Sequence, residues 1–337
     1  MPSHQTRSTR LLWMDVFRGL AVLLVVLLHA QVALVDSQIT RSEPVREINA
    51  AVGAFRMPGL LLVSGMLLHV SLQRPAGPYL SGKLRRIAWP WLLWTAVMIP
   101  FFGLAAAAEP TWWLNGAHTW FLTVVFGCYV LALALKKVPA LVTAAALFSL
   151  GIWLEPDGLQ SSAAVREWLL VADRFAWFGA FFFVGAALGR WRNEVERVPW
   201  WAALIPILVL WDRATEAAEA GRYPAEDTWT NAVMSVIGIL AVLWVLSRVP
   251  AWWPMRALGW VGRHSIVVFV VHYPVIRLLR RVVDPPPGTE GVLIYFAAGA
   301  GVSLLLAAAY PWVKWLFEFP KLPARGEKAR RRPVASA

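Results

Sequence analysis

Three ionisable side chains share one long apolar stretch near the start of the chain. Residues 13–30 have the sequence WMDVFRGLAVLLVVLLHA, with Asp15 and Arg18 at one end and His29 towards the other. Because an α-helix turns about 100° per residue, Arg18 and His29 fall on one face, roughly 16 Å apart along the axis. A neutral imidazole can take a proton from a hydroxyl and pass it on. We therefore predict a site in which His29 is the general base, with Arg18 and Asp15 beside it on the same helix.

This stretch is long enough to cross a membrane, and that constrains where its polar face points. A charge at the centre of a membrane helix costs at least about 2.5–3.5 kcal/mol. The face that carries Arg18 and His29 should therefore point to a protein interior or a wet cavity instead of lipid. We interpret it as one wall of an active site.

A second group of candidate residues is basic. The segment SGKLRRIAWP, residues 81–90, carries Lys83, Arg85 and Arg86 directly before another apolar stretch. Cations at a membrane edge commonly determine topology. The same residues suit the phosphates of an anionic cytoplasmic ligand. The sequence leaves both interpretations open.

Several further polar residues lie in apolar stretches. Arg56 is either a snorkelling anchor or part of a site, and His272 is either held by an interhelical hydrogen bond or part of a site. Ser64 precedes Gly65, a pair typical of close helix packing. The only cysteine, Cys128, fits a small core residue and excludes a disulfide within the chain. No Ser-x-x-Lys, phosphate loop or HExxH motif is present, which favours direct transfer assisted by a base and no metal.

The composition indicates an all-α, polytopic membrane protein. Of the 337 residues 58% are hydrophobic and 15% charged, whereas soluble domains have about 25% charged residues. The first apolar run is too long for a signal peptide and has no cleavage site, so we expect it to remain as a span. We predict ten spans, at 12–35, 49–72, 87–108, 119–136, 138–155, 174–190, 198–212, 229–247, 262–282 and 291–317.

The distribution of Lys and Arg predicts the topology. With the N-terminus inside, the inner segments hold 21 of these residues and the outer segments 9, so both termini are expected in the cytoplasm. We divide the chain into a tail at 1–11, a transmembrane domain at 12–317 and a basic tail at 318–337. The formal charge of +12 is concentrated at membrane edges and in this last tail. It favours contact with anionic lipids over nucleic acid.

Six sequence blocks occur in the order found in acyltransferase family 3, integral membrane proteins that O-acylate cell-surface carbohydrates and other metabolites. The first resembles the family's first-helix pattern of an Arg, ten residues and a His, carried here by Arg18 and His29. Lys83 and Arg86 before Pro90 are similar to its basic pair, with Lys where Arg is common. The other blocks that resemble the family are FRMPGLLLVSGMLL at 55–68, HTWFLTVVFGCY at 118–129, FFFVGAALGR at 181–190 and GWVGRHSIVVFVVHYP at 259–274.

The resemblance implies a stand-alone membrane acyltransferase in the plasma membrane of a bacterium. It would use cytoplasmic acyl-CoA as co-substrate, by default acetyl-CoA, with no permanently bound cofactor. The acceptor would be a hydroxyl of a carbohydrate, a glycolipid or another cell-surface molecule. The donor would dock on Lys83, Arg85 and Arg86, with Arg56 as a further binding residue.

The sequence leaves the oxyanion donor, the choice between enzyme and transporter, and the oligomeric state open. The oxyanion needs hydrogen-bond donors, and Trp120, Ser64 or His272 would supply one. A transporter or flippase with Arg18 and His29 lining its path is the alternative to an enzyme. A purely structural or sensor protein would leave the buried Arg and His unexplained. The oligomeric state is not encoded in a recognisable way, because lipid-facing and dimer-facing surfaces are both apolar.

Overall fold

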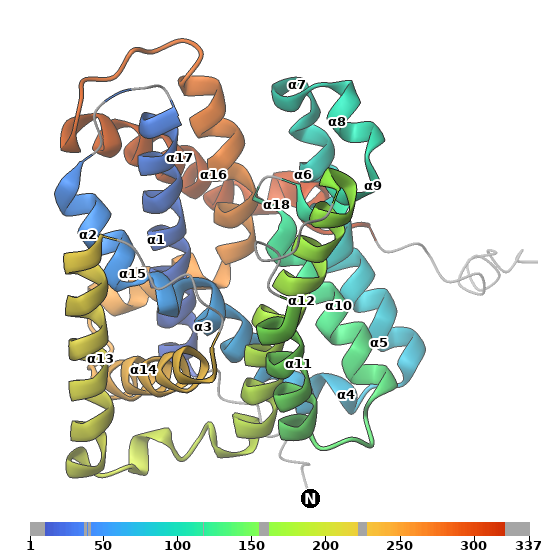
Figure 1. Ribbon diagram of the computed structural model, residues 1–337, viewed down its shortest axis with the longest axis vertical. Coiled ribbons are helices and arrows are strands. Elements are labelled where there is room, and N and C mark those ends of the chain that lie inside the picture. Colours follow the sequence, from blue (N-terminus) through green and yellow to red (C-terminus); the bar gives the residue numbers. More distant parts are fainter. Residues whose placement is uncertain are drawn as a thin grey trace, which may run out of the picture.

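The computed structural model describes residues 11–36, 39, 42–116, 118–154, 162–221 and 228–320, and all regular elements in these residues are helices (Figure 1). The α-helices are α1 (Leu12–Asp36), α2 (Glu43–Ala51), α3 (Gly53–Gly65), α4 (Leu68–Leu72), α5 (Ala76–Lys83), α6 (Trp89–Val97), α7 (Ile99–Phe102), α8 (Leu104–Ala108), α9 (Pro110–Asn115), α10 (Trp120–Ala134), α11 (Ala140–Leu154), α12 (Ala163–Leu188), α13 (Trp200–Ala220), α14 (Trp229–Arg248), α15 (Trp253–Arg263), α16 (Ser265–Leu279), α17 (Thr289–Ala308) and α18 (Tyr310–Val313). A π-helical turn, η1 (Leu84–Ala88), joins α5 to α6, and 3₁₀ turns include η2 (Gly189–Trp191), η3 (Val195–Arg197) and η4 (Lys314–Leu316).

Five helical segments are long and apolar enough to cross a bilayer, namely Leu12–Asp36, Glu43–Leu72, Ala163–Trp191, Trp229–Arg248 and Thr289–Ala308. Shorter apolar helices at Trp120–Ala134, Ala140–Leu154 and Ser265–Leu279 accompany them. The all-α, multi-pass class expected from the sequence is therefore confirmed. The count of about ten spans and the cytoplasmic location of the termini stay predictions.

Some helices differ from the expected spans for local reasons. The expected span 87–108 is divided into α6, α7 and α8, and Gly103 between α7 and α8 has a φ of 92°, which favours glycine. The span expected at 198–212 is part of a longer helix, α13, which continues through Pro206 to Ala220. It therefore extends into the more polar residues that follow Asp212.

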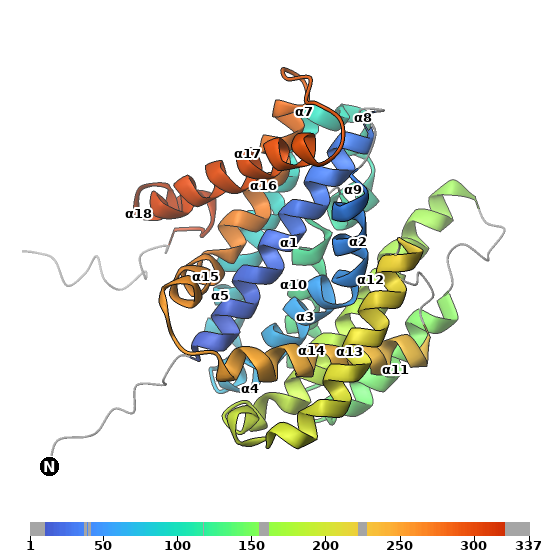
Figure 2. The same cartoon turned by 90° about the vertical axis from the view of Figure 1, so that its left-hand side faces the viewer.

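Glycines bring the central helices into backbone contact. A Cβ on Gly19 of α1 would lie 2.1 Å from the Leu258 carbonyl oxygen, and one on Gly262 of α15 would lie 1.7 Å from the Asp15 carbonyl oxygen. Gly65 of α3 and Gly185 of α12 show the same close approach between those two helices. Small residues allow such contacts in membrane bundles. Helix α1 therefore packs closely against α15, and Figure 2 shows it running through the middle of the bundle.

The last described residues, up to 320, pack against the basic segment at 81–90 and the helix that follows it. The backbone N–H of Phe319 donates to the carbonyl of Arg85 at 3.0 Å, and the indole N–H of Trp94 donates to the carbonyl of Leu316 at 3.1 Å. The Trp94 and Phe317 rings stack with centroids 5.8 Å apart. Residues 318–320 therefore pack on η1 and α6, while residues 321–337 of the predicted tail lie outside the described residues.

Candidate active site

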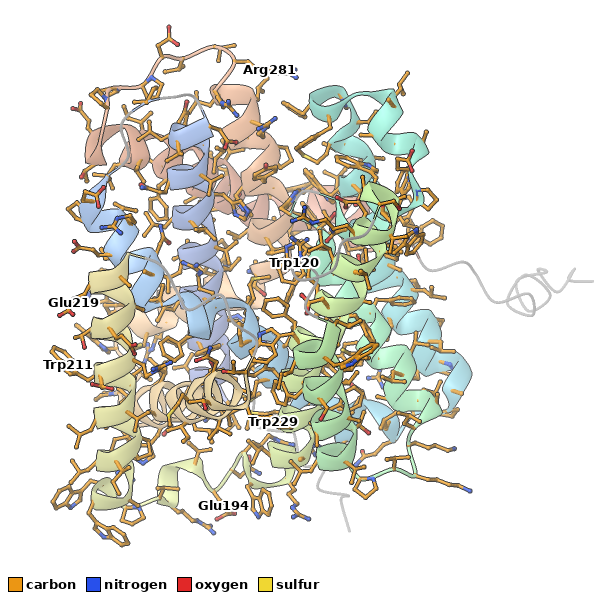
Figure 3. All side chains as sticks on the ribbon, in the orientation of Figure 1. Trp120, Glu194, Trp211, Glu219, Trp229 and Arg281 are labelled. Carbon is orange, nitrogen blue, oxygen red and sulfur yellow. The ribbon has the colours of Figure 1, made fainter. Side chains whose placement is uncertain are left out.

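A cavity of about 250 Å³ lies beside His29 in the interior of the bundle. Helices α1, α3, α10, α12 and α16 and the turn before α10 contribute its wall. Trp120, labelled in Figure 3, belongs to this wall. The lining residues are Val25, Leu28, His29, Gly53, Arg56, Met57, His118, Trp120, Phe178 and Phe269.

His29 is held by two hydrogen-bond acceptors at the same ring nitrogen. The Nδ1 atom of His272 lies 2.9 Å from the Val268 carbonyl oxygen, so Nδ1 carries the hydrogen and Nε2 of His272 is bare. That bare Nε2 lies 3.1 Å from Nδ1 of His29, which is also 3.0 Å from the carbonyl oxygen of Val25. Nδ1 of His29 must therefore donate to both. Its Nε2 is left with a free lone pair, as a general base requires.

A third histidine completes this cluster. His118, in the turn before α10, has 1% exposure, and its ring stacks on Tyr273 with centroids 5.0 Å apart. The ring centroids of His118 and His272 are 5.7 Å apart. Sequence reasoning placed His118 at a span edge and did not select it as a site residue. The only signal was its position directly before Thr119 and Trp120 in a block that resembles the family.

Arg56 contributes a buried cation to the cavity. Its side chain is 8% exposed, and Nη1 donates to Oδ1 of Asn49 at 2.8 Å. Within the described part of the chain no carboxylate lies within 4.0 Å of the guanidinium. Because Arg56 lines the cavity, its remaining N–H groups are available to a ligand there. This position is inside the bundle instead of at a lipid-facing edge.

Of the three candidates for an oxyanion donor, only Trp120 lines the cavity. The Ser64 hydroxyl donates to the carbonyl of Leu60 at 2.7 Å, as the close packing of Gly65 would suggest. The ring N–H of His272 donates to the carbonyl of Val268. The Ser64 hydroxyl therefore bonds to its own helix, and His272 orients His29.

On α1, Arg18 lies about three turns and Asp15 about four turns from His29, and neither lines the cavity. Asp15 is buried at 2% exposure, and its Oδ1 is 3.8 Å from Nη1 of Arg18. Arg18 is near enough to Tyr129 to interact with it electrostatically. Tyr129 in turn lies beneath the ammonium of Lys83, 3.3 Å from its ring centroid.

The basic segment forms a pocket of about 180 Å³. Lys83 and Arg86 line it together with Arg74, and Tyr79 supports it by donating to the carbonyl of Tyr129 at 2.8 Å. Burial, then the charges of Arg74 and Arg86, lower the pKa of Lys83 to about 8. The π-helical turn η1 directly follows Lys83 and carries Arg86; such turns are frequent at functional sites.

Arg85 points away from this pocket. Its Nη2 donates to Oε1 of Glu318 at 2.7 Å, and its Nε donates to the carbonyl of Phe319 at 2.8 Å. Glu318 is 6% exposed and also contacts Arg86 at 3.4 Å and Lys314 at 3.5 Å. Burial acts to raise the pKa of Glu318, but Arg86, Lys314 and Arg85 outweigh it and keep that pKa below its usual value. Of the three predicted cations, Lys83 and Arg86 share the pocket and Arg85 fixes the C-terminal segment.

The fold and this site define a multi-pass membrane protein with an interior histidine cavity and a separate basic pocket. Among the described residues no group of His, Cys, Asp and Glu has the arrangement of a metal site. A family model described as an acyltransferase domain matches residues 11–310, nearly the whole chain. The protein therefore belongs to acyltransferase family 3 and is a membrane acyltransferase. No curated protein and no solved structure gives a significant match.

Proposed function

We propose that the protein is an O-acyltransferase that moves an acetyl group from acetyl-CoA to a hydroxyl of a carbohydrate or other cell-surface acceptor. The observation that carries the proposal is the free lone pair on Nε2 of His29 in an interior cavity, fixed by His272 and Val25. The basic pocket around Lys83 and Arg86 supports an anionic donor. We place the enzyme in the plasma membrane, with the donor on the cytoplasmic side.

The acceptor hydroxyl would donate to Nε2 of His29. Its oxygen attacks the thioester carbonyl carbon, a C–O bond forms, and the proton moves to Nε2. The charge that develops on the carbonyl oxygen is stabilised by the guanidinium of Arg56 and the indole N–H of Trp120. The C–S bond then breaks, and the departing thiolate takes the proton from His29 to give free CoA.

The first helix connects the two sites only in this proposal. Arg18 lies on α1 about three turns from His29, and it would guide the phosphopantetheine arm towards His29. The ammonium of Lys83 would contact the nucleotide phosphates as a point charge, and the guanidinium of Arg86 would bind them through two parallel N–H groups. The donor would thus enter from the basic pocket, and its thioester would reach the cavity.

The first test is release of CoA by the purified protein in nanodiscs with acetyl-CoA. His29→Ala should lower the rate by about 10²–10⁴-fold, the usual contribution of a general base. His69→Ala is the matched control, because His69 is exposed and contacts Arg192 instead of the cavity. Full activity of a correctly inserted His29→Ala variant would overturn the mechanism. Absence of both acetyl-CoA binding and CoA release would shift the assignment to a transporter.

A further inference from the structure

His118 has an unused hydrogen-bond acceptor within the wall of the histidine cavity. Its Nε2 lies 3.1 Å from the carbonyl oxygen of Val270, and a carbonyl can only accept. Nε2 therefore carries the hydrogen of the neutral ring and Nδ1 has a lone pair. Nδ1 is buried and has no hydrogen-bond partner among the described residues.

An orphaned buried acceptor has a cost that a ligand can remove. Buried polar atoms in folded proteins are rarely unpaired, because an unpaired group has lost its hydrogen bonds to water and gained none in return. His118 is rigidly placed, because Val270 holds one side of its ring and Tyr273 stacks on its face. A ligand that brings an O–H to Nδ1 would satisfy it once the atoms that cover Nδ1 move aside.

The neighbours of His118 indicate which ligand group this is. The rings of His29 and His118 both pack on Tyr273, with centroid distances to it of 4.9 Å and 5.0 Å. Both histidines line the same cavity. The residues of the cavity wall thus include two imidazole nitrogens that keep a lone pair, Nε2 of His29 and the covered Nδ1 of His118. The reacting end of a thioester has a carbonyl and no O–H, so it satisfies neither.

We infer that His118 binds a second hydroxyl of the acceptor, next to the one that reacts at His29, and that the acceptor is therefore a diol such as two neighbouring hydroxyls of a sugar ring. This inference rests on the proposed function, since it assumes that the acceptor occupies the cavity of His29. It makes His118 a residue that selects the acceptor and orients it for attack.

Two substitutions separate the two sides of the His118 ring. His118→Asn places a side-chain oxygen near the position of Nδ1 and gives up the bond to Val270. His118→Gln can still donate to Val270 but removes the acceptor at Nδ1. A merely structural role of His118 would make Gln the milder change, whereas acceptor binding makes Asn the milder one.

The assay uses acetyl-CoA with trans-1,2-cyclohexanediol or cyclohexanol, and mass spectrometry measures the acetyl ester. We expect the wild type to favour the diol in kcat/KM by about tenfold or more, as sites built to bind a hydroxyl do. His118→Gln should remove this preference and leave the KM for acetyl-CoA unchanged, and His118→Asn should retain most of it. A preference that survives in His118→Gln, or a change confined to the KM for acetyl-CoA, would overturn the inference.

A binding measurement provides a readout without turnover. In protein labelled with ¹⁵N at its six histidines, the signal of the bare Nδ1 is identified by its loss in His118→Gln. The diol should shift this signal and cyclohexanol should not; a diol that leaves it unchanged overturns the inference. If the signal shifts but acetyl-CoA neither binds nor releases CoA, the proposed function fails while the diol site stands.

Discussion

The Nε2 atom of His272 lies 3.1 Å from Nδ1 of His29, across 243 residues of sequence. This contact and the Val25 carbonyl together keep the hydrogen of His29 on Nδ1, because His272 donates its own hydrogen to Val268. In many catalytic triads a third group orients the base. In the proposed mechanism a neutral imidazole would take this part instead of a carboxylate, so His29 would be oriented without a buried negative charge.

Substitutions of His272 should distinguish a role in orienting His29 through a hydrogen bond from a role in packing alone. His272→Leu removes one of the two acceptors at Nδ1 of His29 and should lower kcat by about 10–100-fold, because Val25 alone then holds the ring and its orientation is less precise. His272→Gln can place an amide oxygen at the same position and should recover part of the rate. Single-turnover rates and pH–rate profiles of the two variants provide the check. Equal losses in both variants would indicate that His272 acts by packing alone.

The affinity for the donor should depend on the charge of Lys83. Because burial, Arg74 and Arg86 lower the pKa of Lys83 to about 8, the free side chain is protonated below this pH and loses its charge above it. The KM for acetyl-CoA should therefore rise between pH 7 and 9, with kcat less affected. Lys83→Arg, which stays charged, should flatten this dependence. A KM that responds identically to pH in both proteins would exclude Lys83 from donor binding.

Glu318 should stabilise the basic segment through Arg85. Glu318→Gln removes the charge from a buried contact of 2.7 Å and should lower the free energy of unfolding by about 1.5–3 kcal/mol. Because Arg85 and Arg86 share η1, the KM for acetyl-CoA should rise as well. Glu194→Gln is the control, since the Glu194–Arg197 pair is exposed and such pairs contribute little. The double variant Arg85→Gln/Glu318→Gln should be no worse than either single change, measured by thermal unfolding.

Gly185 should be intolerant of any side chain. A Cβ there would lie 1.9 Å from the carbonyl oxygen of Leu62, which is backbone and cannot move aside. Gly185→Ala should separate α3 from α12 and lower the yield of folded protein, at a cost above the usual ~1–3 kcal/mol of overpacking. Gly301→Ala in α17 is the control, because nothing lies within 4 Å of its Cβ position. Monodispersity and thermal unfolding in detergent are the measurements.

The sequence alone predicted the membrane class, the family and the helix that carries His29. The membrane class and the helix follow from local properties, since long apolar runs and a period of 3.6 residues are visible without any knowledge of packing. The family followed from the resemblance of six sequence blocks in the right order. The sequence also selected Lys83 and Arg86, which the structure brings into one pocket. The sequence did not show that Arg85, which lies between Lys83 and Arg86 in the chain, points elsewhere. The direction of each side chain depends on the π-helical turn and on Glu318.

Only the tertiary structure decided how the histidines act. His29, His118 and His272 come from three distant parts of the chain. His29 and His272 each contact the carbonyl four residues earlier in their own helix, which is a local contact. The contacts of His118 with Val270 and of His272 with His29 join distant segments, and helical periodicity does not identify them. They exist only after the helices have packed, which glycines such as Gly19 and Gly262 allow between α1 and α15.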